Sequence, residues 1–383
     1  ERETVLRHAR GYAPQPFAAS TPAPCLALGG HQKDALAIAA CGEITLGAHI
    51  GDLDTAEART TLGDTVATTT SLYGLNPALV ACDRHPGYYT THFAERLARE
   101  PARVPHHLAH VLAGMLDNSL DGPILCVAWD GTGYGRDDTI WGGEFLVVDE
   151  TRWRRAAHLW PFRLPGGETA IREPRRAALG ALHAVYGEAA VAMVGLAPLE
   201  DFSPHERAVL GKMLARGLNA PMTSSAGRLF DVAASILGFH QKKTFEGEAA
   251  MAVEFAADRA LASALLPEIA VLPAAGPAVL DWRPMLAGMI EAHRAGAARE
   301  CLASGFHDAL ANSIVAVARR VGLRRVLLTG GCFQNARLAE LTIAALKHAG
   351  FESYWHHRIP PNDGGIAAGQ AVFAGRPLTM EVA

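Results

Sequence analysis

Two histidines, His106 and His110, are the residues whose types and spacing first suggest chemistry. They lie in VPHHLAHVLAGML (104–116), which its apolar spacing and Pro105 predict to be a helix. Residues four apart project from one helix face, so both imidazoles can reach a single divalent ion at about 2.0–2.1 Å. Most such pairs are surface or core residues, and His107, one position off this face, is predicted to be structural or to support the pair.

Two carboxylates would complete such a site. Asp130 ends the apolar segment ILCVAW, where a strand would deliver its side chain to a cleft, and Asp363 stands where a loop enters a helix. The alternative for Asp363 is a plain helix N-cap. Mixed nitrogen and oxygen ligation suits zinc or iron, with magnesium as a further candidate. His356 and His357 are predicted to be strand-end residues rather than ligands.

Glycine-rich turns at 130–135 (DGTGYG), 330–335 (GGCFQN) and 362–369 (NDGGIAAG) are the second chemical feature. Their backbone N–H groups can approach phosphate oxygens, and two of the turns lead into predicted helix starts that favour anions. None is a P-loop, because GxxxxGK[ST] is absent. Any one could be an ordinary tight turn, but three together favour a nucleotide cleft. The candidate contacts are Gly131, Thr132, Gly133, Tyr134, Gly135, Gly330, Gly331 and Asn335.

Two acidic residues on predicted helices, Asp231 and Glu248, could accept hydrogen bonds from ribose hydroxyls. Solvated helix positions are the alternative. The free thiols offer less chemistry: Cys126 and Cys332 lie in or beside apolar strands and are predicted to be small core residues.

The elements that must position these residues occur twice. Segments 25–50 and 124–149 each predict an apolar strand, a glycine-rich turn and a hairpin, broken at Cys41-Gly42 and at Gly142-Gly143. Such a unit, repeated after about 100 residues, suggests a duplicated domain whose glycine turns face one cleft. Chance likeness between short apolar segments is the alternative.

The remaining chain alternates helices and strands. Apolar spacing predicts helices over 224–239, 245–266 and 306–322, and strand ends at 324–331 and 354–360. This alternation favours an α/β fold with a mixed, mostly covered sheet. We expect a linker or the remnant of an upstream module at 1–24, a first lobe of 25–120 plus 360–383, and a second lobe of 121–359.

Size and composition limit the classes of protein. The 383 residues exceed the roughly 250–300 at which single cores stop growing. A net charge of −4 gives no indication of a broad nucleic-acid surface, and no apolar run of about 18–20 residues predicts a membrane span. The start, ERETVLRHARGYAP, is too polar for a signal peptide. Six cysteines without a CxxC pair favour a reducing cytoplasm.

An ordered set of motifs resembles the HypF family of hydrogenase-maturation carbamoyltransferases. The motifs are HIGDL (49–53), ACDRHPGY (81–88), VPHHLAH, DGTGYG with WGGEF, GGETAIREPRRAAL, SSAGRLFDVAASILG, FEGEAAM, GGCFQN and PPNDGGIAAGQA. They follow the family's order over about residues 25–370, so the resemblance covers nearly the whole chain.

The resemblance implies a duplicated actin-like (ASKHA, ribonuclease H-like) two-lobed fold with a central nucleotide cleft, shared with the threonylcarbamoyl-tRNA transferases. It implies a metal-dependent carbamoyltransferase that binds ATP or carbamoyl-adenylate. The acceptor would be the C-terminal cysteine of HypE, and the carbamoyl group would become the cyanide ligand of NiFe hydrogenase. By motif, His106, His110, Asp130 and Asp363 would be catalytic metal ligands. Asp231, Glu248 and Asn335 would face the nucleoside, and 130–135 the phosphates.

Some family features are missing from this sequence. A full-length HypF also carries an acylphosphatase domain, cysteine zinc motifs and a YrdC-like domain that makes the adenylate, so we expect either an excised domain or a short version with a separate YrdC-like partner. Lys33-Asp34 stands where the family pattern has Lys-Asn. His49 is a candidate base for the acceptor thiol. No nucleic-acid or membrane partner is expected.

Three other functions stay open. They are a tRNA threonylcarbamoyladenosine transferase, an antibiotic O-carbamoyltransferase, and an actin-like nucleotide-binding switch without transferase activity. HIGDL and ACDRHPGY favour HypF over the first. The second normally carries an adenylating module after this domain. Paired histidines argue against the third, because such switches hold their ion through the phosphates of the nucleotide.

Overall fold

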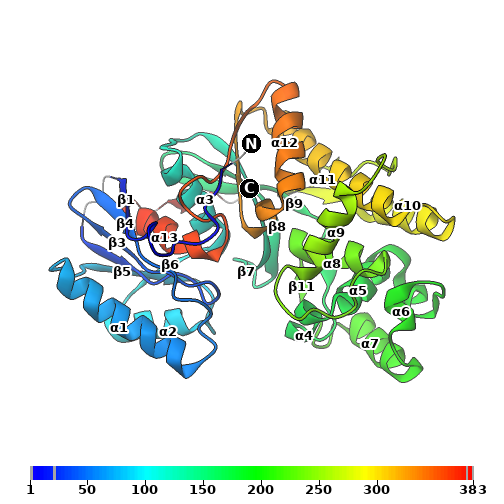
Figure 1. The fold of residues 1–383 in the computed structure, drawn as a ribbon, viewed down its shortest axis with the longest axis horizontal. Helices are drawn as coiled ribbons and strands as arrows, with labels where there is room; N and C mark the ends of the chain where they lie inside the picture. The colour runs from blue at the N-terminus through cyan, green and yellow to red at the C-terminus, as the bar shows by residue number, and fades with distance from the viewer. Residues whose placement is uncertain (1–2, 20–22, 377, 382–383) are drawn as a thin grey trace.

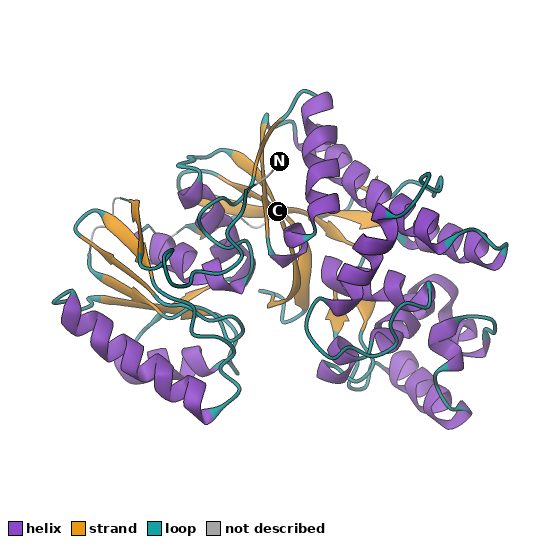
Figure 2. Cartoon of the chain, in the orientation of Figure 1, coloured by secondary structure: helices purple, strands orange, loops and turns teal. Residues whose placement is uncertain are grey.

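The protein has two lobes, which Figure 1 shows with the N-terminal lobe in blue and the larger lobe running from green to orange. The computed structural model describes residues 3–19, 23–376 and 378–381. Parts of the predicted linker and of the predicted C-terminal extension of the first lobe (1–2, 20–22, 377 and 382–383) therefore lie outside the described residues. Each lobe is built on a mixed sheet with helices packed against it, as Figure 2 shows.

The sheet of the first lobe has the strand order β1-β4-β3-β2-β5-β6. Its strands are β1 Gln15–Ala18, β2 Cys25–Ala27, β3 Ala37–Ala40, β4 Glu43–Leu46, β5 Leu79–Asp83 and β6 Ala102–Val104. Alternate side chains of β2 face opposite ways: Cys25 and Ala27 pack with α13 (Ile366–Gly375), whereas Leu26 packs with α1 (Ala56–Leu72) and α2 (Tyr89–Leu97). Both faces of this sheet are therefore covered.

The sheet of the second lobe follows the order β12-β13-β9-β8-β7-β14-β15. Three short strands extend it, because β16 pairs with β9, β11 with β8, and β10 with β11. The strands are β7 Ile124–Tyr134, β8 Ile140–Val148, β9 Arg152–Leu159, β10 Phe162–Arg163, β11 Met222–Thr223, β12 Ala270–Leu272, β13 Ala278–Asp281, β14 Arg325–Thr329, β15 Glu352–Tyr354 and β16 Thr379–Met380.

The two sheets share one topology. In each, an antiparallel three-strand meander (β2-β3-β4 and β7-β8-β9) is joined at its first strand by two parallel strands, β5-β6 and β14-β15. This repeat confirms the predicted duplicated, two-lobed α/β fold. The final helix α13 packs on the first sheet, whereas α3 (His106–Asp117) contacts α13 and also β7, β8 and β14. The two helices thus connect the lobes.

Two predicted turns are strands in the structure. The DGTGYG segment is not a free loop, because β7 continues to Tyr134 across a register shift between Trp129 and Gly133. The predicted hairpin break at Gly142-Gly143 is wrong as well, since both glycines lie inside β8. A side chain at Gly143 would overlap the carbonyl oxygen of Ser224, so the glycine serves the close approach of the segment before α8.

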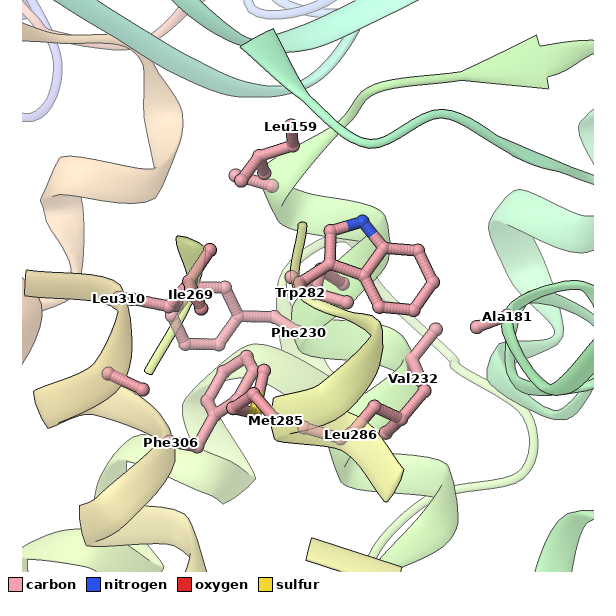
Figure 3. Close-up of a cluster of buried hydrophobic side chains, with 14 of the residues drawn as sticks. Leu159, Ala181, Phe230, Val232, Ile269, Trp282, Met285, Leu286, Phe306 and Leu310 are labelled. Atoms are coloured by element: carbon pink, nitrogen blue, oxygen red, sulfur yellow. The ribbon is translucent and has the colours of Figure 1, made fainter. Parts of the chain in front are cut away.

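The helices of the second lobe are α4 Glu168–Arg172, α5 Pro174–Tyr186, η1 Gly187–Ala192, α6 Ala197–Glu200, α7 Pro204–Arg216, α8 Ala226–Ile236, α9 Glu248–Asp258, α10 Arg283–Arg294, α11 Arg299–Val321, η2 Gly331–Gln334 and α12 Ala336–His348. Their core gathers around Trp282, Phe230 and Phe306 (Figure 3), and the last two rings meet edge to face at 5.1 Å. This packing fixes α8. Asp231, which follows Phe230 on that helix, reaches the site described below.

The helix predictions were right in position but not in length. Helix α9 ends at Asp258, because the following segment leaves Leu261 and Leu265 fully exposed instead of burying an apolar face. Helix α11 begins at Arg299, before the predicted 306. The predicted strand end at 354–360 is mostly irregular, since β15 ends at Tyr354.

Helix α11 is long and apolar enough to cross a membrane by length and composition, and no other helix of the described residues passes that test. Most of it is buried within the second lobe, where Leu302, Phe306 and Leu310 pack in the core. It is therefore the core helix of this lobe.

The predicted linker contains structure that its sequence did not indicate. Strand β1 pairs antiparallel with β4 at the edge of the first sheet. Before it, Val5 N–H donates to the His357 carbonyl, and His49 N–H donates to the His8 carbonyl. The segment is thus held against both the first lobe and the loop before α13.

Candidate metal and nucleotide site

Helix α3 places the paired histidines inside the protein between the lobes. His106, His107 and His110 are almost fully buried, because α3 packs against α13 on one side and β7 on the other. Asp130 projects from β7, and Asp363 begins the short helix η3 (Asp363–Gly365) ahead of α13. The structure therefore brings the four predicted ligands to one point from three elements, α3, β7 and η3.

The distances between these side chains suit one small cation. Nε2 of His106 lies 3.3 Å from Asp130 Oδ2 and 3.9 Å from Asp363 Oδ1, and Nε2 of His110 lies 3.5 and 3.6 Å from the same oxygens. The four ligand atoms all lie within 4.8 Å of one another. A tetrahedral ion with ligands at 2.0–2.2 Å separates those ligands by about 3.3–3.6 Å. The cluster therefore has the dimensions of a zinc- or iron-sized site.

Neighbouring groups fix the orientation of the ligands. Nδ1–H of His106 donates to Asp83 Oδ2 at 2.8 Å, which leaves the Nε2 lone pair free to face the cluster. The backbone N–H of Gly331 donates to Asp130 Oδ1 at 3.0 Å, so Oδ2 is directed toward the histidines. Asp83 and Gly331 thus hold two of the four ligands in place.

Hydrogen bonding inside the protein does not satisfy the cluster. Both ring nitrogens of His110 are buried and have no hydrogen-bond partner among the described residues. A buried polar atom without a partner costs free energy, typically about 1–3 kcal/mol. A cation would accept the Nε2 lone pairs of both histidines and neutralise the two carboxylates. The cluster therefore fits a bound cation.

The ionisation of the histidines follows from the same contacts. Burial lowers the pKa of His106, but the carboxylates of Asp83 and Asp130 more than offset it, so the net pKa is well above the usual value. Burial likewise lowers the pKa of His110, but the adjacent carboxylates of Asp130 and Asp363 more than offset it, so the net pKa is above the usual value. Burial lowers the pKa of His107, and His106 lowers it further, so His107 is neutral.

A pocket of about 360 Å³ opens beside this cluster. Its polar wall includes Asp130, Gly131, Lys33 and Gly331, and an apolar wall comes mainly from α8 and α9. The apolar lining residues are Leu6, Phe230, Ala250, Met251 and Phe255. A cavity with an apolar wall and a polar, glycine-lined end is the arrangement that a nucleotide requires.

The residues predicted to face the nucleoside are placed differently from one another. Asp231 lines the pocket, but its carboxylate is already held by Lys243 at 3.0 Å and Arg228 at 3.1 Å. Asn335 also lines the pocket, and its side chain caps α12 through the Leu338 N–H and contacts His307. Glu248 does not line this pocket, and its carboxylate accepts the Thr244 N–H at 2.6 Å.

The predicted glycine contacts separate into three groups. Gly131 and Gly331 line the nucleotide-sized pocket. Thr132, Gly133 and Tyr134 instead line a second cavity. Gly135 and Gly330 serve packing, since a side chain there would overlap Trp141 and the carbonyl of Trp129 respectively.

Sequence reasoning missed several charged residues of the site. Asp83, which holds His106, lies in ACDRHPGY, and Arg228 lies in SSAGRLFD; each motif was recognised only as a resemblance. Lys33 of the first lobe pairs with Glu246 of the second across the pocket. A contact between residues so distant in sequence leaves no periodic signal.

The departure at Lys33-Asp34 has a structural consequence. Asp34 is fully buried, and burial raises the pKa of its carboxyl well above the usual value, a shift that Asp363 increases. Backbone hydrogen bonds from Ala35 and Gly30 offset part of that shift. The carboxyl is therefore neutral over a range in which a solvent-exposed aspartate is charged. His49, the candidate base, lines neither cavity.

A duplicated two-lobed fold with a candidate cation site beside a nucleotide-sized pocket defines a class of nucleotide-binding α/β proteins. Comparison with known proteins narrows the class. The family model described as "Carbamoyltransferase, Kae1-like Domain, second subdomain" matches residues 126–370, and "HypF Kae1-like domain" matches residues 20–117. The chain belongs to the HypF carbamoyltransferase family.

Relatives in several organisms agree. The chain is 38% identical to the carbamoyltransferase HypF of Synechocystis, over 95% of this chain and 49% of that protein. It is 37% identical to HypF of Rhizobium leguminosarum over 98% of this chain and 48% of the relative. The chain thus spans about half the length of these relatives. A HypF homologue of Cupriavidus necator is 35% identical, over 96% of this chain and 95% of that protein.

Solved structures show the same fold. A full-length HypF in a phosphate- and nucleotide-bound form matches with a TM-score of 0.89 and 33% identity, over 97% of this chain and 58% of that one. The HypF of T. kodakarensis matches with a TM-score of 0.86 and 29% identity, over 97% of this chain and 50% of that chain.

Proposed function

We propose that this chain is a metal-dependent carbamoyltransferase that takes the carbamoyl group of carbamoyl-adenylate and passes it to the C-terminal cysteine of HypE. The observation that carries the proposal is the convergence of His106, His110, Asp130 and Asp363 beside the nucleotide-sized pocket. Family membership supports the carbamoyl chemistry, and the nucleotide-bound relative supports ATP or its adenylate as the ligand.

The residues of the chain would bind and orient the donor. Lys33 and Arg228 are the cations of the pocket, and they would offset the phosphate charge beside its acidic side chains. Asp83 would keep His106 in the tautomer that presents Nε2. When bound, a divalent cation would supply a Lewis acid for the carbonyl or phosphate oxygen of the donor.

The transfer needs no enzyme nucleophile. The acceptor thiolate attacks the carbonyl carbon, a C–S bond forms, the bond from that carbon to the phosphate oxygen breaks, and AMP leaves with the electron pair. The thiol proton is lost to solvent before attack. The chain's contribution is to align sulfur and carbonyl and to hold the developing charge.

We also propose that the carbamoyl group serves the cyanide ligands of NiFe hydrogenase, that a YrdC-like module supplies the adenylate, and that the chain works in the cytoplasm. All six cysteines are free thiols, which suits a reducing compartment.

The test is to incubate the chain with ATP, carbamoyl phosphate and a HypE peptide ending in cysteine, with and without a YrdC-like module, and to weigh the peptide. The expected product carries one carbamoyl group. His106→Ala with His110→Ala should abolish stoichiometric metal and transfer while the fold persists. His205→Ala with His348→Ala, at two exposed positions, is the matched control. Unchanged metal content in the first double variant rejects the site, and activity on tRNA instead of the peptide favours the threonylcarbamoyl transferase.

A further inference from the structure

A second cavity of about 980 Å³ lies between the lobes and has no role in the mechanism above. It shares no lining residue with the nucleotide-sized pocket, and the two meet along β7. Asp130 and Gly131 line the pocket, whereas Thr132 and Gly133 line the second cavity. We call this second cavity the cross-lobe groove.

The cross-lobe groove comes close to the candidate metal ligands. A side chain on Gly133 would come within 2.5 Å of the His106 ring, so only the glycine backbone separates groove and ligand here. The hydroxyl of Tyr88, another lining residue, is close enough to Asp83, Asp363 and Asp130 for their charges to raise its pKa, after the larger effect of burial. A molecule in the groove could therefore reach the same reacting centre as the donor from a different side.

The wall from the first lobe is an aromatic stack. Tyr88 lies between two imidazoles, with ring centroids 4.1 Å from His85 and 5.4 Å from His31. Nδ1 of His85 accepts the Gly87 N–H at 3.1 Å, so the neutral ring carries its proton on Nε2. That N–H has no hydrogen-bond partner among the described residues and is a donor, not a base.

The wall from the second lobe supplies a cation. Arg172, at the end of α4, lines the groove, is exposed, and has no ion pair among the described residues. The acidic groups of the groove are Asp54, which His31 approaches at 3.1 Å, and Glu168. Arg172 is the cationic side chain of this lining, and with the His85 N–H it can donate to an anion, because an arginine fork matches a carboxylate.

We propose that the cross-lobe groove binds the carboxyl-terminal tail of the acceptor protein, with Arg172 and the Nε2–H of His85 receiving the terminal carboxylate. This inference rests on the proposed function, because it assigns the acceptor side of that same reaction. The carboxylate and the thiol of a terminal cysteine belong to one residue, so anchoring the carboxylate fixes the sulfur within a few bonds of it. Arg172 and His85 are positioning residues in this arrangement.

The test measures binding first, without chemistry. A peptide with the HypE tail sequence, ending in serine instead of cysteine, is titrated into the full chain by fluorescence anisotropy, once as the free acid and once as the terminal amide. For the natural chain we expect the acid to bind about tenfold or more tightly than the amide, the range for a hydrogen bond to a charged group.

Variants assign that preference. Arg172→Gln should weaken binding of the acid peptide toward that of the amide peptide and leave binding of the amide peptide unchanged. His85→Phe should weaken the acid peptide, whereas His85→Gln, which keeps an N–H donor, should recover part of the affinity. Arg216→Gln, at an exposed arginine at the end of α7 that lines neither cavity, is the matched control. In transfer assays with the cysteine peptide, Arg172→Gln should raise KM and leave kcat unchanged.

The two proposals fail separately. If the serine peptide binds more tightly as the free acid than as the amide but no transfer occurs with the cysteine peptide, the assignment of the groove is supported and the carbamoyltransferase proposal fails. If transfer occurs but Arg172→Gln alters neither the acid preference nor KM, or if no peptide binds, the groove assignment is overturned.

Discussion

Gly133 gives the sharpest test of how tightly the site is built. The two glycines of β7 nearest the candidate ligands, Gly131 and Gly133, both have backbone conformations open to L-amino acids, so alanine can be placed at either without backbone strain. Their surroundings differ. A Cβ at Gly133 would lie 2.5 Å from both His106 Cδ2 and His107 Cε1, whereas a Cβ at Gly131 would meet nothing closer than 3.8 Å.

The magnitude follows from those distances. Ordinary carbon contacts are about 3.5–4.0 Å, so Gly133→Ala must displace the imidazoles by roughly 1 Å. A shift of that size would break the 2.8 Å hydrogen bond from His106 to Asp83. Overpacking a buried site typically costs about 1–3 kcal/mol. We therefore expect the free energy of unfolding to fall by about that amount and metal affinity to fall by about tenfold or more.

The assay uses metal-free protein. Urea unfolding gives the stability of the natural chain, Gly133→Ala and Gly131→Ala, and competition of each with a chelator for Zn²⁺ and for Fe²⁺ gives the affinity. Gly131→Ala should be nearly neutral in both measurements. If Gly133→Ala binds metal as tightly as the natural chain, or if Gly131→Ala is equally damaged, the reasoning about His106 is refuted.

Three further predictions concern charge. Asp83→Asn should weaken metal binding by about 10–100-fold, because the amide cannot accept and orient the His106 N–H as the carboxylate does; Asp54→Asn on the groove rim is the control, and chelator competition measures both. Metal affinity should fall as the pH is lowered from 8 to 6, since the raised pKa values of His106 and His110 let protons compete with the metal ion for the imidazoles. Calorimetry in buffers of different ionisation heat should detect protons released on metal binding, and the absence of that release would contradict this prediction. Asp34→Asn should stabilise the metal-free protein by about 1 kcal/mol or more at pH 8 and by less at pH 5. In the natural chain the folded state keeps a proton on Asp34 that the unfolded state has lost, so that chain loses stability as the pH rises above the unfolded pKa of Asp34. Equal urea midpoints for Asp34→Asn and the natural chain at pH 8, with exposed Asp64→Asn as the reference, would count against this account.

The fold was predictable where the sequence repeats itself. The apolar strands at 25 and 124 and the hairpins that follow them indicated a duplication, and the two sheets share that topology. The two predicted turns that proved to be strands both involve glycine. DGTGYG and Gly142-Gly143 look like turns because glycine is common in turns, yet here the missing side chains let β7 approach α3 and let β8 approach Ser224. Sequence alone does not distinguish a glycine that bends the chain from one that makes room for a neighbour.

The candidate metal cluster could be anticipated because two of its ligands share one helical turn, which is a local pattern. The nucleotide side was harder. Asp231 and Glu248 were chosen as free carboxylates on helices, but Lys243, Arg228 and Thr244 already bind them. Those partners are themselves positioned by the tertiary packing of α8 and of the segment before α9. The chemical availability of a side chain therefore depends on its neighbours, which spacing does not reveal.

The position of β7 explains why one strand can serve two ligands. Its last residues line the two cavities one after the other, with Asp130 and Gly131 on the pocket and then Thr132 and Gly133 on the cross-lobe groove. A donor in the pocket and an acceptor in the groove would then be separated only by a strand whose glycines carry no side chain. Gly133→Ala should close that contact as well as displace His106. The substitution that tests the metal ligands should therefore also abolish carbamoyl transfer, even where excess Zn²⁺ or Fe²⁺ restores metal binding.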